Sequence, residues 1–407
     1  MAPHNGLVHL KEYDVKDSNI ELIGSDLDHK VKHASAETEP AWNDGHVGRT
    51  AGLFVWRIEN FAVVPVPQSL HGQFHSGDSY IVLHSQPTTS KPPKLLHDIY
   101  FYLGAHTTQD EAGTAAYKTV ELDTFLNGTA TQHRELGIRP SKSFLALFPR
   151  VTILRGGVAS GFHHVPTPEQ TAAAGDDQPE RITTLLRIFK HPSASTILVH
   201  EIEPTHHSLD AGDVFIAETN RAKIWVWQGS GCSPMEKARA AQVAHEMREA
   251  KRGEVEVVEQ EGAGGRRVVR LLGGGEEVGA GEGLRAVARP GVGGGNKAAG
   301  GGRRRLFRLS DASGRLEFGL VREGGGISRR DLDGEDVFVL DDGGETIWVW
   351  EGQGASRAER AMWLKVAQAY VRKLQGEDGD DEAYLTPIAK VREGSESAAF
   401  LRAVEAA

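Results

Sequence analysis

The stretch LDAGDVFIAETNRAKIWVWQGSGCSPMEKARAAQVAHEM, Leu209–Met247, has a counterpart at Leu332–Tyr370, LDGEDVFVLDDGGETIWVWEGQGASRAERAMWLKVAQAY. In both stretches an acidic residue precedes an apolar strand, and a turn, an IWVW strand, a glycine turn and an amphipathic helix follow. Four identical pairs lie 123 positions apart: Asp213 and Asp336, Trp225 and Trp348, Trp227 and Trp350, and Glu236 and Glu359. This constant spacing admits no insertion and predicts an internal repeat.

A looser first copy precedes these two. SGDSYIVLHS (76–85) supplies the acidic residue and its strand, and HDIYFYLGAHTTQDEAGTAAYKTVELDTFL (97–126) supplies the second strand and the helix. A similar leading strand stands before each copy: LFVWRIENF, TTLLRIFKH and RLFRLSDAS. In the third helix, Trp363, Val366, Ala367 and Tyr370 form one apolar stripe. A helix packed on a small sheet gives an α+β unit, and the chain is predicted to contain three in tandem.

The three copies tile the chain from about residue 49 to its end. The predicted segments are an N-terminal polar extension with a few apolar anchors (1–48), repeat 1 (49–166), a linker (167–180), repeat 2 (181–275), a glycine-rich linker (276–302) and repeat 3 (303–407). Glycine is already abundant from Gly262, with scattered arginines. We therefore expect most of Gly262–Gly302 to be flexible coil.

Composition narrows the class of protein. The 407 residues are 39% hydrophobic, which suits ordinary globular cores, and no run approaches the roughly 20 apolar residues of a membrane span. The net charge of −10 argues against nucleic acid as a partner, because nucleic-acid-binding proteins usually present a basic face. Cys232 is the only cysteine, so an internal disulfide is excluded and a reducing compartment, the cytoplasm, is expected.

Three predicted helices begin with a hydroxyl residue that is followed three positions later by glutamate. The pairs are Thr108 with Glu111, Ser233 with Glu236, and Ser356 with Glu359. This spacing is typical of a capping box, in which the hydroxyl and the carboxylate each accept a hydrogen bond from a backbone N–H at the start of the helix. Capping alone can therefore explain the glutamates, and Pro234 at a first helical position supports that boundary.

A second carboxylate in each copy favours a ligand site over capping alone. Asp78, Asp213 and Asp336 each open a strand and follow Gly77, Gly212 and Glu335. If strand and helix pack together, the Asp, the Glu and a backbone carbonyl converge on a hard cation, which takes about six to eight oxygens. Without a cation, two close carboxylates would repel each other. We therefore predict calcium in each copy, and the lack of a His or Cys cluster argues against zinc.

The first predicted helix carries apolar residues on two faces. A core stripe contains Ala112, Ala115, Ala116, Thr119 and Leu122, whereas Tyr117 and Val120 lie on a second face with Glu121 and Thr124. Such a helix is either buried on both faces or keeps one for a partner. An ordinary half-exposed tyrosine and valine remain the alternative.

The segments VWRIENFAVVPVP, GQFHSGDSYIVL, QDEAGTAAYKTVELDTFLNG, QHRE and GGVASGFHHV resemble the first repeat of the gelsolin family, within the gelsolin/villin superfamily. The three-repeat length, with AETEPAW upstream, resembles the severin and fragmin members of the family. The resemblance implies repeats with a small mixed sheet between a long and a short helix. It also implies calcium-regulated severing of actin filaments, capping of barbed ends and nucleation, by a cytoplasmic, cytoskeletal protein that binds monomeric and filamentous actin and is not an enzyme.

The resemblance also assigns site residues. For calcium within each repeat it implies the carbonyls of Gly77 and Val158 with Asp78 and Glu111 in the first, Gly212, Asp213 and Glu236 in the second, and Glu335, Asp336 and Glu359 in the third. For a second calcium site shared with actin it implies Asp123 and the carbonyls of Gly128 and Ala130. The second face of the first helix, with Tyr117, Val120, Glu121 and Thr124, would enter a cleft in actin.

Anionic phosphoinositide lipid is a further partner that the resemblance implies, but the second repeat departs from the family here. Its leading strand offers Arg187, Lys190 and little more, although the runs GGRRVVR and GGGRRRLFR could serve instead.

Two other functions compete with severing. A hydrolase could use the Asp and Glu as base and acid, but three equivalent pairs would imply three active sites. The other alternative is a calcium-dependent actin capping or bundling protein without severing activity, in which bundling would use several weak actin sites.

Overall fold

The computed structural model describes residues 36–88, 94–138, 140–157, 179–191, 196–275, 303–343, 346–377 and 386–405. Residues 167–178 of the linker predicted at 167–180 lie outside these ranges, as do the whole linker predicted at 276–302 and Val158. Within them, every helix is too short or too polar to cross a membrane.

Repeats 2 and 3 have the same order of elements, and repeat 1 contains two further strands. Repeat 1 contains β1 (Gly52–Glu59), β2 (Ala62–Pro65), β3 (Gln73–His75), β4 (Ser79–Pro87), β5 (Leu95–Leu103), α2 (Gln109–Phe125), β6 (Thr131–Leu136), α3 (Lys142–Leu145) and β7 (Val151–Leu154). Repeat 2 contains β8 (Ile182–Lys190), β9 (Ile197–Ile202), β10 (Val214–Thr219), β11 (Lys223–Gln228), α5 (Pro234–Lys251), β12 (Glu254–Glu259) and α6 (Ala263–Leu271). Repeat 3 contains β13 (Arg305–Ser310), β14 (Glu317–Glu323), β15 (Val337–Asp341), β16 (Ile347–Glu351), α7 (Arg357–Glu377), β17 (Ile388–Arg392) and α8 (Ala398–Glu405).

The predicted α+β repeat is confirmed. The leading strand pairs antiparallel with the strand after the acidic residue, which pairs antiparallel with the next strand. The long helix then crosses over to a parallel strand, so each sheet is mixed. Alternation along β10 shows why helices cover both faces: Val214 and Ile216 pack with Ala240 of α5, whereas Phe215 packs with Val268 of α6.

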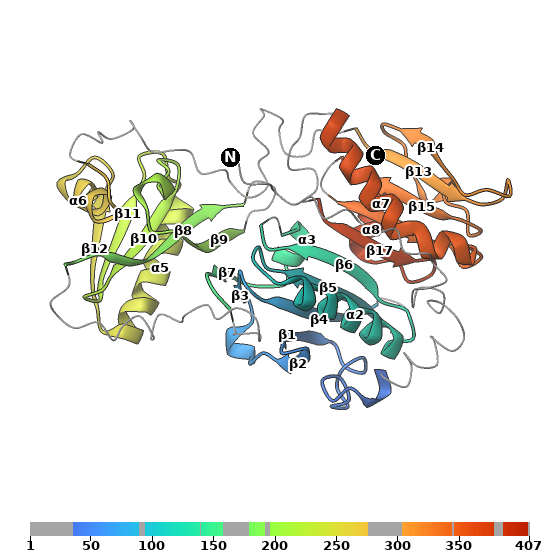
Figure 1. The fold of residues 1–407 in the computed structure, drawn as a ribbon, viewed down its shortest axis with the longest axis horizontal. Helices are drawn as coiled ribbons and strands as arrows, with labels where there is room; N and C mark the ends of the chain where they lie inside the picture. Colours follow the sequence, from blue (N-terminus) through green and yellow to red (C-terminus); the bar gives the residue numbers. More distant parts are fainter. Residues whose placement is uncertain are drawn as a thin grey trace, which may run out of the picture.

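The sheets are shared between repeats, which the expectation of one small sheet per repeat did not include. β17 of repeat 3 pairs antiparallel with β6 of repeat 1. This makes one ten-stranded sheet in the order β14-β13-β15-β16-β17-β6-β5-β4-β1-β2. Strands β7 and β3 of repeat 1 extend the sheet of repeat 2. The resulting seven-stranded sheet has the order β12-β11-β10-β8-β9-β7-β3. Figure 1 shows repeats 1 and 3 side by side, with repeat 2 at the opposite end of the molecule.

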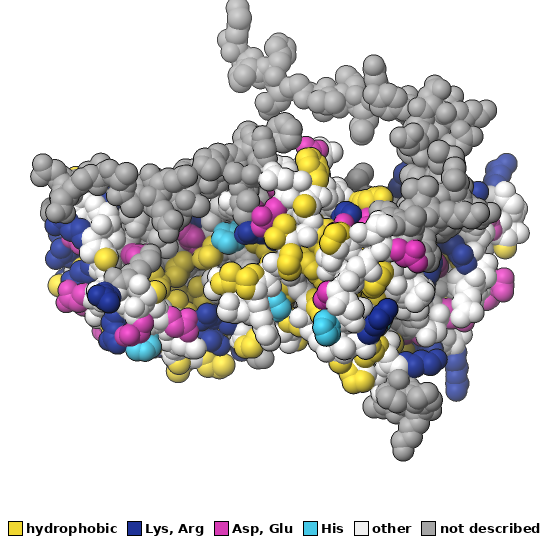
Figure 2. Space-filling view, turned by 90° about the horizontal axis from the view of Figure 1, so that it is seen from below, with side chains coloured by type: hydrophobic (Ala, Val, Ile, Leu, Met, Phe, Trp, Pro, Cys, Tyr) yellow, Lys and Arg dark blue, Asp and Glu magenta, His cyan; other side chains and the backbone are white. Residues whose placement is uncertain are grey.

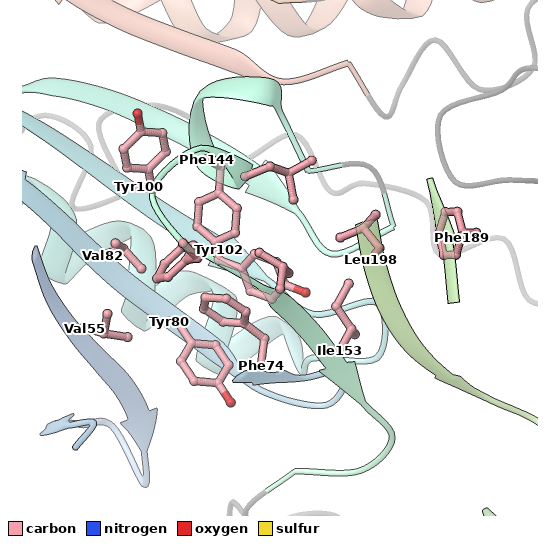
Figure 3. Packing of buried hydrophobic residues seen from close by; sticks show 13 residues of the cluster. Val55, Phe74, Tyr80, Val82, Tyr100, Tyr102, Phe144, Ile153, Phe189 and Leu198 are labelled. Carbon is pink, nitrogen blue, oxygen red and sulfur yellow. The ribbon is translucent and has the colours of Figure 1, made fainter. Parts of the chain in front are cut away.

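Aromatic packing joins repeats 1 and 2. The Phe74 ring lies within 4.7 to 5.4 Å, between ring centroids, of those of Tyr80, Tyr102, Phe144 and Phe148. Leu198 of β9 and Phe189 of β8 belong to the same buried cluster and lie at its edge in Figure 3. The first two repeats therefore share a hydrophobic core through β7 and β9.

The N-terminal extension contributes to repeat 1 over its described residues. Trp42 is fully buried, and its ring meets that of Trp56 edge to face at 6.2 Å between centroids. Its indole N–H donates to the Ala36 carbonyl at 3.0 Å. The apolar anchors expected in this extension therefore include Trp42 and Val47, which lie in the same core cluster as α2.

The expectation that most of Gly262–Gly302 is coil is wrong for its first part, where α6 forms. The glycines there allow α6 to lie directly against β12. A Cβ on Gly264 would lie 2.4 Å from Val258 Cγ1, and one on Gly265 would lie 2.2 Å from the Glu259 carbonyl oxygen. Glycine in this segment therefore serves close packing, not only flexibility.

We expect Gly264→Ala to lower the free energy of unfolding of repeat 2 by about 1–3 kcal/mol, because its methyl group overpacks this contact. Urea denaturation followed by tryptophan fluorescence measures the change. Gly275→Ala is the matched control, since a Cβ there meets no atom within 4 Å. Equal stability of the two variants would contradict the packing role of Gly264.

Candidate functional site

The turn before each predicted calcium-binding aspartate has the same backbone geometry in all three repeats. The Asp carbonyl accepts a hydrogen bond from a glycine N–H at the end of the next strand. The pairs, each at 3.0 Å, are Gly104 with Asp78, Gly229 with Asp213, and Gly352 with Asp336. A second bond closes each turn: His106 N–H to Ser76 O at 2.6 Å, Gly231 N–H to Ala211 O at 2.8 Å, and Gly354 N–H to Gly334 O at 2.8 Å. The repeat therefore preserves the shape of this turn and the position of its carboxylate.

In repeat 1 the two predicted carboxylates are both buried. Asp78 is 1% exposed and Glu111 is 4% exposed. A chain of hydrogen bonds joins the residue next to Asp78 with Glu111: Ser79 Oγ lies 2.7 Å from Thr107 Oγ1, which donates to Glu111 Oε2 at 3.2 Å. The Thr108 hydroxyl caps α2 by accepting from the Glu111 N–H, so half of the predicted capping box forms. The Glu111 side chain contacts Thr107 instead of returning to the cap.

The backbone at Gly157 closely approaches the Asp78 carboxylate. A Cβ on Gly157 would lie only 2.1 Å from Asp78 Oδ1, so glycine alone fits there. The Gly77 N–H donates to the Gly156 carbonyl at 2.8 Å, which fixes this segment against the turn. Val158, the next residue, is outside the described residues. A buried carboxylate held against the backbone is the kind of oxygen ligand that calcium takes.

In repeats 2 and 3 the glutamates complete the predicted capping boxes. Glu236 Oε2 accepts from the Ser233 N–H at 2.8 Å, and Glu359 Oε2 accepts from the Ser356 N–H at 2.9 Å. Their other oxygens accept from the N–H groups of Lys190 and Asp311, both at 2.8 Å. The capping explanation is therefore geometrically satisfied in these two repeats, although each carboxylate oxygen keeps a free lone pair for a cation.

The aspartates of repeats 2 and 3 are held by arginines that the sequence argument did not assign. Arg187 Nε donates to Asp213 Oδ2 at 2.7 Å, and Arg308 Nε donates to Asp336 Oδ2 at 2.6 Å. Burial, with Asp311 and Asp336 nearby, raises the pKa of Glu359. Among the described residues, no three His, Cys, Asp or Glu side chains form a metal-binding group. A calcium ion in any repeat would therefore need backbone carbonyls as ligands besides the Asp and Glu.

The residues predicted for the second calcium site come together at the junction of repeats 1 and 3. Asp123 Oδ1 accepts from the Ala130 N–H at 3.0 Å, and the Asp123 carbonyl accepts from the Gly128 N–H at 2.7 Å. Burial raises the pKa of Asp123, against the lowering influence of the Ala130 N–H and Arg392. The Arg392 Nη1 donates to the Gly128 carbonyl at 2.9 Å. An arginine of repeat 3 is thus hydrogen-bonded to a carbonyl of repeat 1 that is predicted to bind calcium.

A cleft of about 290 Å³ lies at this junction, and its lining includes Gly128, Glu351, Arg360 and Arg392. Glu351 is the centre of an ion cluster: Oε2 lies 2.6 Å from Lys390 Nζ, and Oε1 accepts from Arg392 Nε at 3.1 Å. These cations lower the pKa of Glu351, although its burial acts in the opposite direction. The cluster holds Arg392 in place beside repeat 1.

The predicted partner face of α2 is exposed, but Glu121 is separate from it. Tyr117 is 47% exposed and Val120 is 38% exposed, and the Thr124 hydroxyl donates to the Val120 carbonyl at 2.9 Å. Glu121 is buried and pairs at 3.0 Å with Lys118 Nζ, which also binds Glu39 of the N-terminal segment. The exposed apolar residues of this face are therefore Tyr117 and Val120, with Thr124 partly exposed beside them.

Charged side chains of both signs are mixed on one face of the described residues. Acidic and basic side chains are interspersed on the face shown in Figure 2, with hydrophobic side chains between them in the middle of the molecule. Arg187 is buried, which removes it from the residues available to a phosphoinositide headgroup. Arg266, Arg267 and Arg270 of α6, from the GGRRVVR run, are exposed.

We expect stability to depend on pH through His200 of β9, where repeats 1 and 2 meet. Burial, with Arg187 and His106 nearby, lowers the pKa of His200 to about 4. Its stabilising contribution is present above the unfolded pKa of about 6.5 and is lost as the pH falls toward 4. We expect protonation linked to this histidine to lower the free energy of unfolding by about 2 kcal/mol when the pH falls from 7.5 to 5. His200→Gln should remove that difference in urea denaturation, while the exposed control His207→Gln should keep it.

The comparisons with known proteins agree with this arrangement. The family model for the Gelsolin repeat matches residues 60–144, 195–267 and 325–401. The chain is 36% identical to Gelsolin-like protein 1 of Lumbricus terrestris, over 98% of this chain and 99% of the relative. It is 35% identical to Severin of Echinococcus granulosus, over 90% and 92%. It is 33% identical to Actin depolymerising venom protein gelsolin 1 of Platymeris rhadamanthus, over 87% and 88%. Since the three matched segments fall in the three structural repeats, the chain belongs to the gelsolin family.

Proposed function

We propose that this protein is a calcium-regulated actin-binding protein that severs filaments and caps their barbed ends. The observation that carries the proposal is the exposed pair Tyr117 and Val120 on a helix whose other face is buried in the repeat 1 core. Exposed aromatic and aliphatic anchors on a helix suit insertion into a hydrophobic groove. The names of the relatives, Severin and Actin depolymerising venom protein gelsolin 1, support actin as the partner that contains this groove.

Calcium would be held in repeat 1 by Asp78, Glu111 and the carbonyls of Gly77 and Val158, with a second ion at Asp123, Gly128 and Ala130. The corresponding ligands in the other repeats are Gly212, Asp213 and Glu236, and Glu335, Asp336 and Glu359. When bound, calcium supplies positive charge that offsets the repulsion between neighbouring carboxylates. Because Arg392 holds the Gly128 carbonyl, repeat 3 would have to move away from repeat 1 before the second site could form.

Severing requires two modules that act together. One repeat holds the side of the filament while α2 of repeat 1 enters between subunits, and linkage raises the effective concentration of the second contact. Such a protein acts in the cytoplasm on the cytoskeleton.

A hydrolase function does not fit, since gelsolin-family proteins are not enzymes. Phosphoinositide binding is left out of the proposal, because the leading strand of repeat 2 exposes little positive charge.

Dilution of pyrene-labelled actin filaments tests this function. With calcium, the full chain should accelerate the loss of fluorescence, because severing creates new ends that lose subunits. With a calcium chelator, the decay should match that of actin alone. A calcium-dependent slowing would indicate capping without severing, and a rise in low-shear viscosity would indicate bundling; either result would contradict severing.

A further inference from the structure

One arginine in each repeat occupies the same position relative to the predicted calcium-binding aspartate. On the leading strand, Arg57 is paired in register with Tyr80, Arg187 with Phe215, and Arg308 with Phe338. Each partner lies two residues after the aspartate of its repeat. Since residues two apart on a strand share a face, the arginine and the aspartate lie on the same side of the sheet. The arrangement is therefore a property of the repeat and not of one copy.

The three arginines differ in how tightly they hold the carboxylate. In repeat 1, Arg57 Nη1 lies 3.6 Å from Asp78 Oδ2, and its Nε donates to Glu59 instead, at 2.6 Å. In repeat 3, Arg308 binds Asp336 through Nε and Nη2, but its side chain is 43% exposed.

In repeat 2 both the arginine and the aspartate are buried. Arg187 is 1% exposed and Asp213 is fully buried, and Nε and Nη2 lie 2.7 and 2.6 Å from Asp213 Oδ2. The guanidinium carbon lies 4.6 Å from the centroid of the Phe189 ring, which packs on one side of it. Asp213 is thus neutralised by a buried cation that belongs to the protein.

We infer that these arginines are built-in counter-ions that compete with calcium, and that Arg187 makes repeat 2 the last repeat to accept it. The inference rests on the proposed calcium sites and adds the order in which they fill: repeat 1, then repeat 3, then repeat 2. Calcium cannot share Asp213 with a guanidinium at this distance without strong repulsion. Its entry into repeat 2 therefore requires Arg187 to leave a buried position, whereas Arg308 can swing into water.

Calorimetric titration of the full chain with calcium tests the inference. Arg187→Met should raise the calcium affinity of one site at least tenfold. It should also lower the melting temperature in chelator, because Asp213 is left without its cation. Calcium should then raise the melting temperature of this variant more than that of the wild-type chain. Arg267→Met is the matched control, since Arg267 is an exposed arginine of the same repeat, and it should leave calcium affinity unchanged.

Two further variants cover the case in which Arg187→Met does not fold in chelator. Arg187→Lys keeps a positive charge but loses the two-pronged contact, and should give a smaller increase in affinity. Arg308→Met should raise the affinity of the repeat 3 site by less than tenfold, because that arginine is partly exposed.

The outcomes separate this inference from the function it rests on. Asp213→Asn with Glu236→Gln identifies the repeat 2 site by removing it from the titration. If the wild-type chain binds calcium and the folded Arg187 variants bind it with unchanged affinities, the counter-ion role is wrong while calcium regulation stands. If neither the wild-type chain nor any variant takes up calcium, the calcium sites are wrong and the inference falls with them.

Discussion

Replacing Asp78 by Asn together with Glu111 by Gln will weaken calcium binding by repeat 1 more than about 100-fold, from an expected dissociation constant in the range of about 10⁻⁷ to 10⁻⁵ M. Both carboxylates are buried in repeat 1, and Arg57 Nη1 lies 3.6 Å from Asp78 Oδ2. The amides keep the size of the side chains but remove both negative charges.

Calorimetry on the full chain measures the loss of one site. The variant should remain folded without calcium, because the replaced side chains retain oxygen acceptors for Tyr80 and Thr107. Asp110→Asn is the matched control, since Asp110 is an exposed acid in the same first turn of α2. Unchanged stoichiometry and affinity in the double variant would show that Glu111 and Asp78 have a structural role only.

Tyr117→Asp will reduce affinity for monomeric actin by at least about 30-fold, the size expected when a central aromatic anchor worth about 2 kcal/mol is lost. Tyr117 is 47% exposed, so the new charge lies in water in the free protein. In the complex the same charge would have to be buried in an apolar groove, which is costly without a partner. The melting temperature should therefore stay unchanged while binding is lost.

Fluorescence titration of labelled actin monomers measures this affinity. Met235→Asp is the matched control, because Met235 is an exposed apolar residue, at 56%, on the long helix of repeat 2. It should bind monomers as the wild-type chain does. Equal affinity of the Tyr117 and Met235 variants would remove this face of α2 from the mechanism.

The sequence was most informative where the repeat itself carries the structural cause. The acidic residue, the strand pair and the long helix recur in the same order in all three repeats, with a fixed spacing in repeats 2 and 3, and the structure contains them in each repeat. The exposed face at Tyr117 and Val120 was also predictable, because helical periodicity separates it from the stripe containing Ala115 and Leu122. These features depend on residues close together in the chain.

Features that depend on distant segments were not predictable in the same way. The pairing of β17 with β6 joins two strand edges from different repeats, and local pattern does not specify which edges meet. Glu121 was assigned to the partner face from its helical position, but Lys118 and the N-terminal segment around Glu39 cover it. The arginine in each leading strand was visible in the sequence, but its pairing with the aspartate became clear only from the strand register.

The central claim is that calcium switches on filament severing, and direct observation of single filaments tests it. Fluorescent actin filaments on a surface are followed by total internal reflection microscopy while the full chain is added with calcium or with chelator. We expect breaks along the filaments in calcium-containing buffer and none in chelator, with few breaks in calcium for Tyr117→Asp. Filaments that stay intact in calcium, or that fragment equally well in chelator, would contradict it.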